Sequence, residues 1–217
     1  MMEPLICITF DDGYETDRTI VYEEMTARDL RGTTYLVTEY VDKYPGQYLT
    51  SAQIEEMKEE WDFQCHLHHH RNLPQEKRKE KHRQFRKLNE KFAELELPYP
   101  EHIAYPFGAI DYETIEITKK YRRSGRTVER ELLDYDDFDM YKLPSHSLYI
   151  NSSAELNEKK ELVDQAISEN KCLLIYRHEI QAGTEGYFTD FLDYVVSCGI
   201  KSVNHSELFN ILSKLQQ

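Results

Sequence analysis

Short apolar and β-branched runs alternate along this chain with longer stretches in which apolar residues recur every three or four positions. The first pattern is typical of buried strands and the second of amphipathic helices. We expect strands at 4–10, 33–38, 62–66, 102–106, 126–129, 147–150, 171–178 and 200–203, and helices at 15–30, 51–60, 75–95, 112–121, 154–169, 188–198 and 206–215. Thr50 and Gln53 form a capping-box pattern before the second of these helices.

This alternation of strands and helices predicts an α/β fold, a distorted, TIM-like (β/α)7–8 barrel. No Pro/Gly/Ser-rich linker or repeat interrupts the 217 residues, so we expect residues 1–217 to form a single domain. In such barrels, side chains at the carboxyl ends of the strands converge on one face. Candidate chemistry is therefore expected where each predicted strand ends.

The first and third predicted strands both end in side chains that bind metals. Asp11 and Asp12 end the first strand in "TFDDG", and the third strand ends in "CHLHHH". His66 and His70 are four residues apart, a spacing at which two imidazoles on a helical turn bind one metal ion. Two histidines and one carboxylate leave a coordination position open, which is typical of a catalytic site. Cys65 should face away from such a site, because neighbouring strand residues alternate sides.

Two other strand ends carry weaker signals. In "IAYPFGAID", Pro106 and Gly108 force a turn that brings backbone N–H groups toward a ligand in some proteins and is only structural in most. The seventh strand ends at Arg177 and His178. A histidine at a strand tip is a candidate proton donor because its ordinary pKa lies near neutrality.

Composition excludes several classes of partner. The net charge of −13 argues against nucleic acid, because polyanions are bound by clusters of lysine and arginine. No apolar run approaches the ~18 residues that span a bilayer, and the N-terminus "MMEPLICITF" lacks the basic region of an export signal. We therefore expect a cytoplasmic protein that does not cross a membrane. The four cysteines lack CxxC spacing and are expected to be reduced.

The segment 76–91 is locally basic, in contrast to the whole chain. Its apolar residues recur at helical spacing, which favours an amphipathic helix with a solvated basic face. A docking face for an anionic partner is the alternative.

Taken together, these segments resemble the polysaccharide deacetylase family, which is carbohydrate esterase family 4 with the NodB homology domain. "TFDDG" at 9–13 matches its first motif, and "HLHHH" at 66–70 matches its H-[ST]-x-x-H motif with Leu67 in the Ser/Thr place. "YPFG" at 105–108 is similar to a variant of the third motif, and "LIYRH" at 174–178 is similar to the last. The four motifs occur in the family's order and cover nearly the whole chain.

The resemblance implies a ligand set and a reaction. Asp12 would complete a metal site with His66 and His70, and the metal would be divalent, with zinc first and cobalt, nickel or iron as alternatives. Asp11 would be the general base that deprotonates a metal-activated water, and His178 would protonate the leaving amine. The implied enzyme is a metal-dependent hydrolase that removes N-acetyl groups from N-acetylated amino sugars, so its partner is an N-acetylated carbohydrate.

Three residues are candidates for contact with the substrate, the first of them through the resemblance. The backbone N–H of Phe107, in the place of a family tyrosine, would bind the oxyanion of the tetrahedral intermediate. Tyr105 and Tyr14 lie near the site in sequence and are candidates for contact with a sugar. The oligomeric state is left open by the sequence.

Two family features are missing. The arginine that orients the catalytic aspartate in the common third motif is replaced by Ala104, and the "LPR" of a related branch reads "LPSH", with Ser145 and His146. The candidates for a replacement cation are Arg122, Arg123 and Arg177. The Asp-Trp pair that supports the catalytic histidine has no clear match, although Asp137 or Asp139 lies in the corresponding segment.

These departures keep two other hypotheses open. The same metal site could hydrolyse a different substrate, either an acetyl ester of xylan or a small cyclic amide or ureide. Alternatively, the chain could be a metal- and sugar-binding module that has lost catalysis through Ala104 and the missing Asp-Trp pair.

Overall fold

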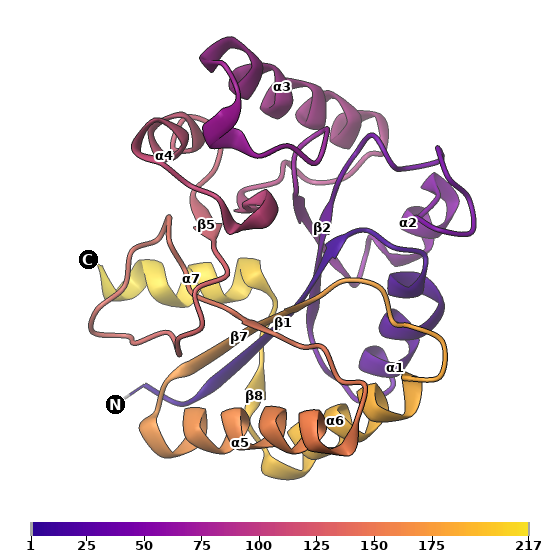
Figure 1. Cartoon of the computed structure of the whole chain (residues 1–217), viewed down its shortest axis with the longest axis vertical. Helices are drawn as coiled ribbons and strands as arrows, with labels where there is room; N and C mark the ends of the chain where they lie inside the picture. The colour runs from indigo at the N-terminus through magenta and orange to yellow at the C-terminus, as the bar shows by residue number, and fades with distance from the viewer. Residues whose placement is uncertain (1, 217) are drawn as a thin grey trace.

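A computed structural model describes residues 2–216, in which parallel strands form one curled sheet (Figure 1). The strands are β1 (Leu5–Asp12), β2 (Gly32–Leu36), β3 (Asp62–Cys65), β4 (His102–Ala104), β5 (Ser124–Arg126), β6 (His146–Ser147), β7 (Cys172–Arg177) and β8 (Lys201–Ser202). Their order is β5-β4-β3-β2-β1-β7-β6, and β8 pairs with the first residues of β1. The α/β class and the distorted barrel predicted from the sequence are confirmed.

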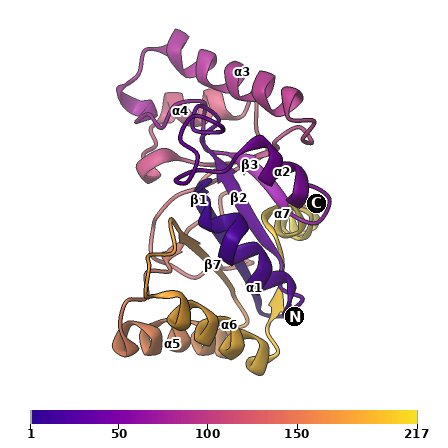
Figure 2. The same ribbon diagram turned by 90° about the vertical axis from the view of Figure 1, so that its right-hand side faces the viewer.

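Helices follow most of the strands. They are η1 (Asp17–Tyr22), α1 (Glu23–Thr26), α2 (Ser51–Met57), η2 (Leu73–Gln75), α3 (Arg78–Glu94), η3 (Pro106–Gly108), α4 (Tyr112–Thr118), α5 (Ser153–Glu169), α6 (Glu185–Cys198) and α7 (His205–Leu215). In both ribbon views α3 and α4 lie at one end of the molecule, and α5 and α6 lie at the other (Figures 1 and 2). The predicted capping box of α2 is present, with Thr50 and Gln53 satisfying each other's backbone N–H groups.

The two edges of the curled sheet are joined by the segment that precedes β6. Leu143 forms a parallel bridge with Arg126 at the end of β5, and its N–H donates to the Gly125 carbonyl. A few residues later the same segment pairs with β7 as β6. The interior of the sheet is therefore enclosed on the β5 side, and residues of β5 come close to residues of β1.

Side chains of β1 alternate between two apolar clusters. Ile6, Ile8 and Phe10 pack against the outer helices, whereas Leu5 and Cys7 pack inside with α7. By the same alternation Asp11 faces the interior. The chain then turns at two positive φ values, 74° at Asp12 and 75° at Gly13. Glycine suits the second position because a Cβ there would lie 2.7 Å from Leu36 Cδ2.

β5 begins earlier than the sequence pattern suggests. We expected a strand at 126–129, but the paired residues are 124–126. All three are buried although they are Ser124, Gly125 and Arg126. Ser124 hydrogen-bonds His102 and His205, and a Cβ on Gly125 would lie 2.5 Å from the Tyr105 ring. A strand that buries a small residue and two hydrogen-bonded polar residues has no hydrophobic signature for a sequence pattern to detect.

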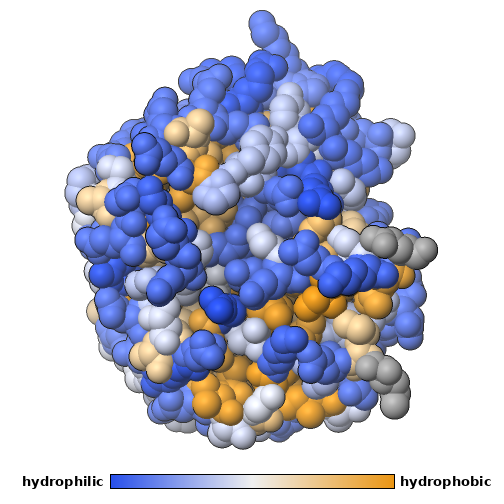
Figure 3. Space-filling view, turned by 180° about the vertical axis from the view of Figure 1, so that it is seen from behind, coloured by the Kyte–Doolittle hydropathy of each residue, from blue (hydrophilic) through white to orange (hydrophobic). Residues whose placement is uncertain are grey.

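The basic segment 76–91 contains most of α3, as the helical spacing predicted. Phe85, Leu88 and Phe92 are buried beneath it, while its outer side chains are polar or charged. In the view from behind, mostly hydrophilic residues cover the upper half of the molecule, where α3 and α4 lie (Figure 3). The four cysteines are free thiols, as expected. Within residues 2–216, the helices are all too short or too polar to cross a bilayer.

Candidate metal centre

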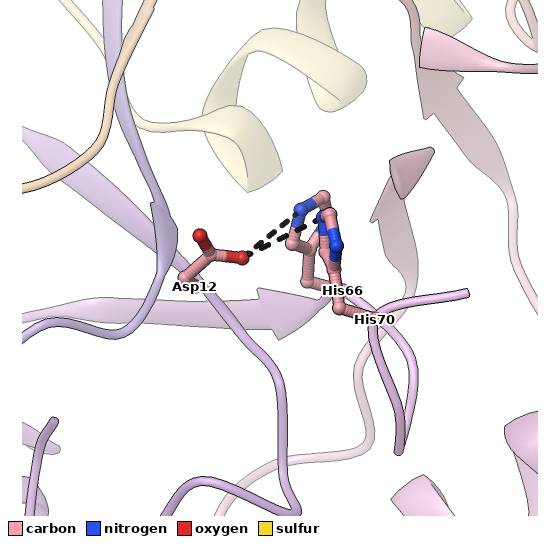
Figure 4. Close-up of side chains that lie close together, drawn as sticks. All are labelled: Asp12, His66 and His70. Carbon is pink, nitrogen blue, oxygen red and sulfur yellow. Dashed lines mark ion pairs between the residues drawn. The ribbon is translucent and has the colours of Figure 1, made fainter. Parts of the chain in front are cut away.

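Asp12, His66 and His70 form a compact group at the carboxyl ends of β1 and β3 (Figure 4). Asp12 Oδ1 lies 3.5 Å from His66 Nε2 and 3.7 Å from His70 Nε2. One ligand atom from each residue lies within 4.8 Å of those of the other two. The sequence prediction that one aspartate and these two histidines meet is therefore matched by the geometry.

The two histidines converge by a different route from the one expected. Residues 66–70 do not form a helical turn; the chain bends after β3, with Leu67 at a φ of 69°. His66 Nδ1 lies 2.7 Å from the Ala104 carbonyl oxygen. Because this carbonyl can only accept, Nδ1 carries the proton and the Nε2 lone pair faces Asp12. Burial lowers the pKa of His66 to about 3, so the ring is neutral, as a ligand must be.

The donor set fits a divalent transition metal. Asp12 Oδ1 is buried and has no hydrogen-bond partner among residues 2–216. Burial and the neighbouring charge of Asp11 raise the pKa of Asp12 to about 7, a cost that a bound cation would offset. Ligands of a tetrahedral zinc lie about 3.3–3.6 Å apart, close to the separations seen here. Cys65 lies in the apolar cluster outside the sheet.

Asp11 is held by Arg126. The Arg126 Nη2 donates to both oxygens of Asp11, at 2.5 and 2.6 Å, and both residues are buried. The guanidinium lies between the rings of Tyr35 and Tyr176, 5.3 and 4.8 Å from their centroids. Burial raises the pKa of Asp11, but the charge and hydrogen bonds of Arg126, together with the nearby His66 and His178, lower it, and the net shift of the pKa is downward. Asp11 is therefore a carboxylate.

The sequence analysis did not name Arg126 as the cation that replaces the family arginine; it named three other arginines, which have other partners. Arg122 stacks on Phe85 and Tyr99, Arg123 pairs with Glu101, and Arg177 donates to the Leu148 carbonyl and to Thr184 Oγ1. Ser145, in the place of the "LPR" arginine, accepts from Arg126 Nη1 at 3.2 Å. The sequence did contain a signal for Arg126. Ser145 stands where a related branch has arginine, and this small side chain leaves room for an arginine from β5.

His178, at the end of β7, faces the same group of residues. Its Nε2 lies 3.9 Å from Asp12 Oδ2, and its Nδ1 lies 2.5 Å from the Tyr149 hydroxyl. Neither Asp137 nor Asp139 contacts His178 within the described residues; Asp139 Oδ1 accepts from the Tyr141 N–H instead. Tyr149 is therefore the residue beside His178 Nδ1, the place in which an aspartate was expected.

The three predicted substrate residues have different environments. Phe107, at a φ of 62°, has 62% of its surface exposed, and its ring lies 4.4 Å from that of His70. Tyr14 is half-buried and stacks on Tyr48, with 4.8 Å between ring centroids. The Tyr105 side chain is 2% exposed and packs against Gly125, so its ring is not available to a sugar.

The remaining histidines near the metal-ligand group have other partners. His68 Nδ1 lies 3.1 Å from Thr38 Oγ1, and His69 Nδ1 contacts the Glu39 carboxylate. His146 lines a cavity of about 640 Å³ beside α5 and is not in contact with Asp12. These side chains do not add ligands to the group of Asp12, His66 and His70 within the described residues.

A curled parallel sheet with an Asp-His-His group at its carboxyl edge defines an α/β protein with a candidate metal centre. Residues 1–124 match the family model for polysaccharide deacetylase. The chain therefore belongs to the polysaccharide deacetylase family. The match includes Asp12, His66 and His70 and ends before Arg126, Tyr149 and His178. A search of curated proteins finds no match.

Solved structures share the fold at low identity. A polysaccharide deacetylase from Bacillus cereus is 21% identical over 73% of this chain and 50% of its own, with a TM-score of 0.60. A peptidoglycan N-acetylglucosamine deacetylase is 17% identical over 96% and 89%, with a TM-score of 0.64. A putative polysaccharide deacetylase from Mycobacterium smegmatis is 10% identical over 100% and 92%, with a TM-score of 0.79. The chain thus spans about half the length of the B. cereus protein.

Removing one imidazole should abolish tight metal binding. In His70→Ala, we expect zinc affinity measured by titration calorimetry on chelator-stripped protein to fall by more than about 100-fold, because even outer partners of ligands contribute about 10- to 100-fold. His68→Ala is the matched control, since His68 is adjacent but bonded to Thr38. An equal loss of affinity in both variants would contradict the ligand set.

The Asp11–Arg126 pair should show strong coupling in stability. Arg126→Met leaves a buried carboxylate without its cation and should lower the free energy of unfolding by about 3–5 kcal/mol in urea at pH 7. The double variant Asp11→Asn/Arg126→Met should recover much of that loss, because no buried charge remains. Additive effects of the two single changes would show that the residues do not act as a pair.

Proposed function

We propose that this protein is a metal-dependent N-deacetylase of N-acetylated amino sugars in oligo- or polysaccharides. One observation carries the proposal: a metal-ligand group, an ionised carboxylate and a histidine converge at one edge of the sheet. These are the groups that metal-assisted hydrolysis requires. Membership of the polysaccharide deacetylase family supports the substrate class.

Asp12, His66 and His70 would hold the cation, with zinc first among the candidates. A divalent cation there supplies a Lewis acid that polarises the amide carbonyl and lowers the pKa of water toward 7. Asp11 accepts the proton of the attacking water, because Arg126 keeps this carboxylate ionised. The backbone N–H of Phe107 donates to the oxyanion that develops on the amide oxygen.

His178 completes the reaction by protonating the leaving nitrogen. The C–N bond then breaks, and acetate and a free amine are released. In the imidazolium form, Nδ1–H donates to the Tyr149 oxygen, so that Nε2–H points toward the group containing Asp12. Tyr149 is thus a positioning residue that aims the His178 proton at the substrate.

The first test is acetate release from N-acetylglucosamine oligomers. Chelator-stripped protein should release none, and added zinc or cobalt should restore release. Asp11→Asn should lower kcat by at least about 100-fold while metal content stays that of the wild type, because a general base contributes about 10²–10⁴-fold. Circular dichroism verifies that the variant is folded.

Each other outcome would change a different part of the proposal. Loss of metal in Asp11→Asn would mean that the roles of the two aspartates are exchanged. Tight metal binding without acetate release would contradict the deacetylase, and panels of acetylated xylan and of cyclic amides and ureides would then test for another hydrolase. Absence of turnover on every panel would favour a metal- and sugar-binding module.

The role of Tyr149 predicts a selective kinetic effect. Tyr149→Phe keeps the ring but removes the hydroxyl that orients His178, and should lower kcat about tenfold with KM unchanged, the signature of a lost transition-state interaction. Tyr176→Phe is the control, because the Tyr176 ring lies 5.9 Å from His178 and its hydroxyl is not needed to stack on Arg126. An equal fall in kcat in both variants would argue against positioning by Tyr149.

A further inference from the structure

Positive charge is concentrated at the end of the molecule that contains α3 and α4 (Figure 1). Nine of the 27 lysines and arginines lie in residues 71–91, which contain only three acidic residues. This segment has a formal charge of +6, whereas the rest of the chain has a formal charge of −19. An anionic partner is therefore attracted to the α3 end of the molecule and repelled by the remainder.

The cations of this end gather on one side of α3. Arg78, His82 and Arg86 follow one another at intervals of four residues, and Lys79 lies about two helical turns before Arg86. Burial lowers the pKa of His82, and so do the charges of three cations around it, Lys120, Arg78 and Arg86. Lys120, which follows α4, therefore adjoins the same side of α3. We call Arg78, Lys79, His82, Arg86 and Lys120 the basic face.

Several charges of the basic face have no acidic partner. Lys79, Arg86 and Lys120 are exposed, and within residues 2–216 no Asp or Glu oxygen lies within 4.0 Å of their nitrogens. Arg78 does pair with a carboxylate, that of Glu113, at 3.1 Å. Many cations elsewhere are paired in the same way, among them Arg18, Arg28, Lys43, Lys58 and Lys171. Unpaired charges are available to the anions of a partner.

The shape of this end and two exposed tyrosines favour a lipid surface as the partner. The apolar side of α3 is packed in the core, so its basic side faces outward along a helix of 17 residues. Such a convex side contacts a broad surface along its length. Tyr112, the first residue of α4, is 81% exposed, and Tyr99, which accepts a hydrogen bond from Asn89 of α3, is 55% exposed. Tyrosine rings are enriched at the level of lipid headgroups.

We propose that the basic face docks this protein on an anionic lipid bilayer. Its lysines and arginines contact the phosphate headgroups, and Tyr99 and Tyr112 lie at the headgroup level beside them. The charge of −19 on the rest of the chain does not prevent docking, because charges beyond the Debye length of about 8 Å at physiological salt are largely screened. The inference concerns a surface outside the metal centre and does not rest on the proposed deacetylase function.

The test compares two variants that each lose two lysines. Lys79→Gln/Lys120→Gln removes two charges of the basic face, and Lys159→Gln/Lys160→Gln removes two from α5, at the other end of the molecule (Figure 2). Affinity is measured by co-sedimentation with vesicles of equal parts phosphatidylglycerol and phosphatidylcholine. Each lysine near such a surface contributes about fivefold in affinity. The first variant should therefore bind about 25-fold more weakly than the wild type, and the second should bind as the wild type does.

Equal affinities of the two variants for these vesicles would overturn the docking surface. Equal binding to pure phosphatidylcholine vesicles would also overturn it, as would binding that persists at about 1 M salt, where the Debye length is about 3 Å. So would tighter binding of duplex DNA, or self-association at low salt without vesicle binding, since the partner would then be nucleic acid or a second copy. Circular dichroism verifies that both variants fold. The measurements need no turnover, so acetate release tests the deacetylase separately.

Discussion

The buried pair of Asp11 and Arg126 joins the first strand of the sheet to the fifth across its interior. A buried carboxylate is costly without a partner, and here the cation arrives from a residue 115 positions away in sequence. Stacking on Tyr35 and Tyr176 fixes the guanidinium. The pair can form only when the curling of the sheet places β5 close to β1. The ionised state of Asp11 therefore depends on the closure of the fold.

Adjacent aspartates acquire opposite environments because the backbone turns between them. Asp11 follows the strand alternation into the interior and is bound by Arg126, whereas Asp12, at a φ of 74°, faces His66 and His70. One carboxylate already has a cation, and the other has a buried oxygen without a partner among the described residues. Because of this difference, the proposed mechanism assigns the metal to Asp12 and the proton transfer to Asp11.

The side chains that support the candidate site come from other positions than in the family pattern. Arg126 on β5 pairs with Asp11, whereas the place of the family arginine is taken by Ala104. Tyr149 occupies the position beside His178 that an aspartate was expected to fill. These supports differ from the family pattern, whereas Asp12, His66 and His70 keep its first two motifs.

The α/β class, most of the strands and helices, and the residues of the candidate metal centre could be predicted from the sequence. These features are local: hydrophobic period marks an element, and "TFDDG" and "HLHHH" lie at strand ends. The partners of Asp11 and His178, the burial of Tyr105 and the position of β5 could not be predicted and became clear from the folded chain. Each of these features depends on contacts between segments that are distant in sequence. In addition, β5 buries serine, glycine and arginine, so no hydrophobic pattern marks it as a strand.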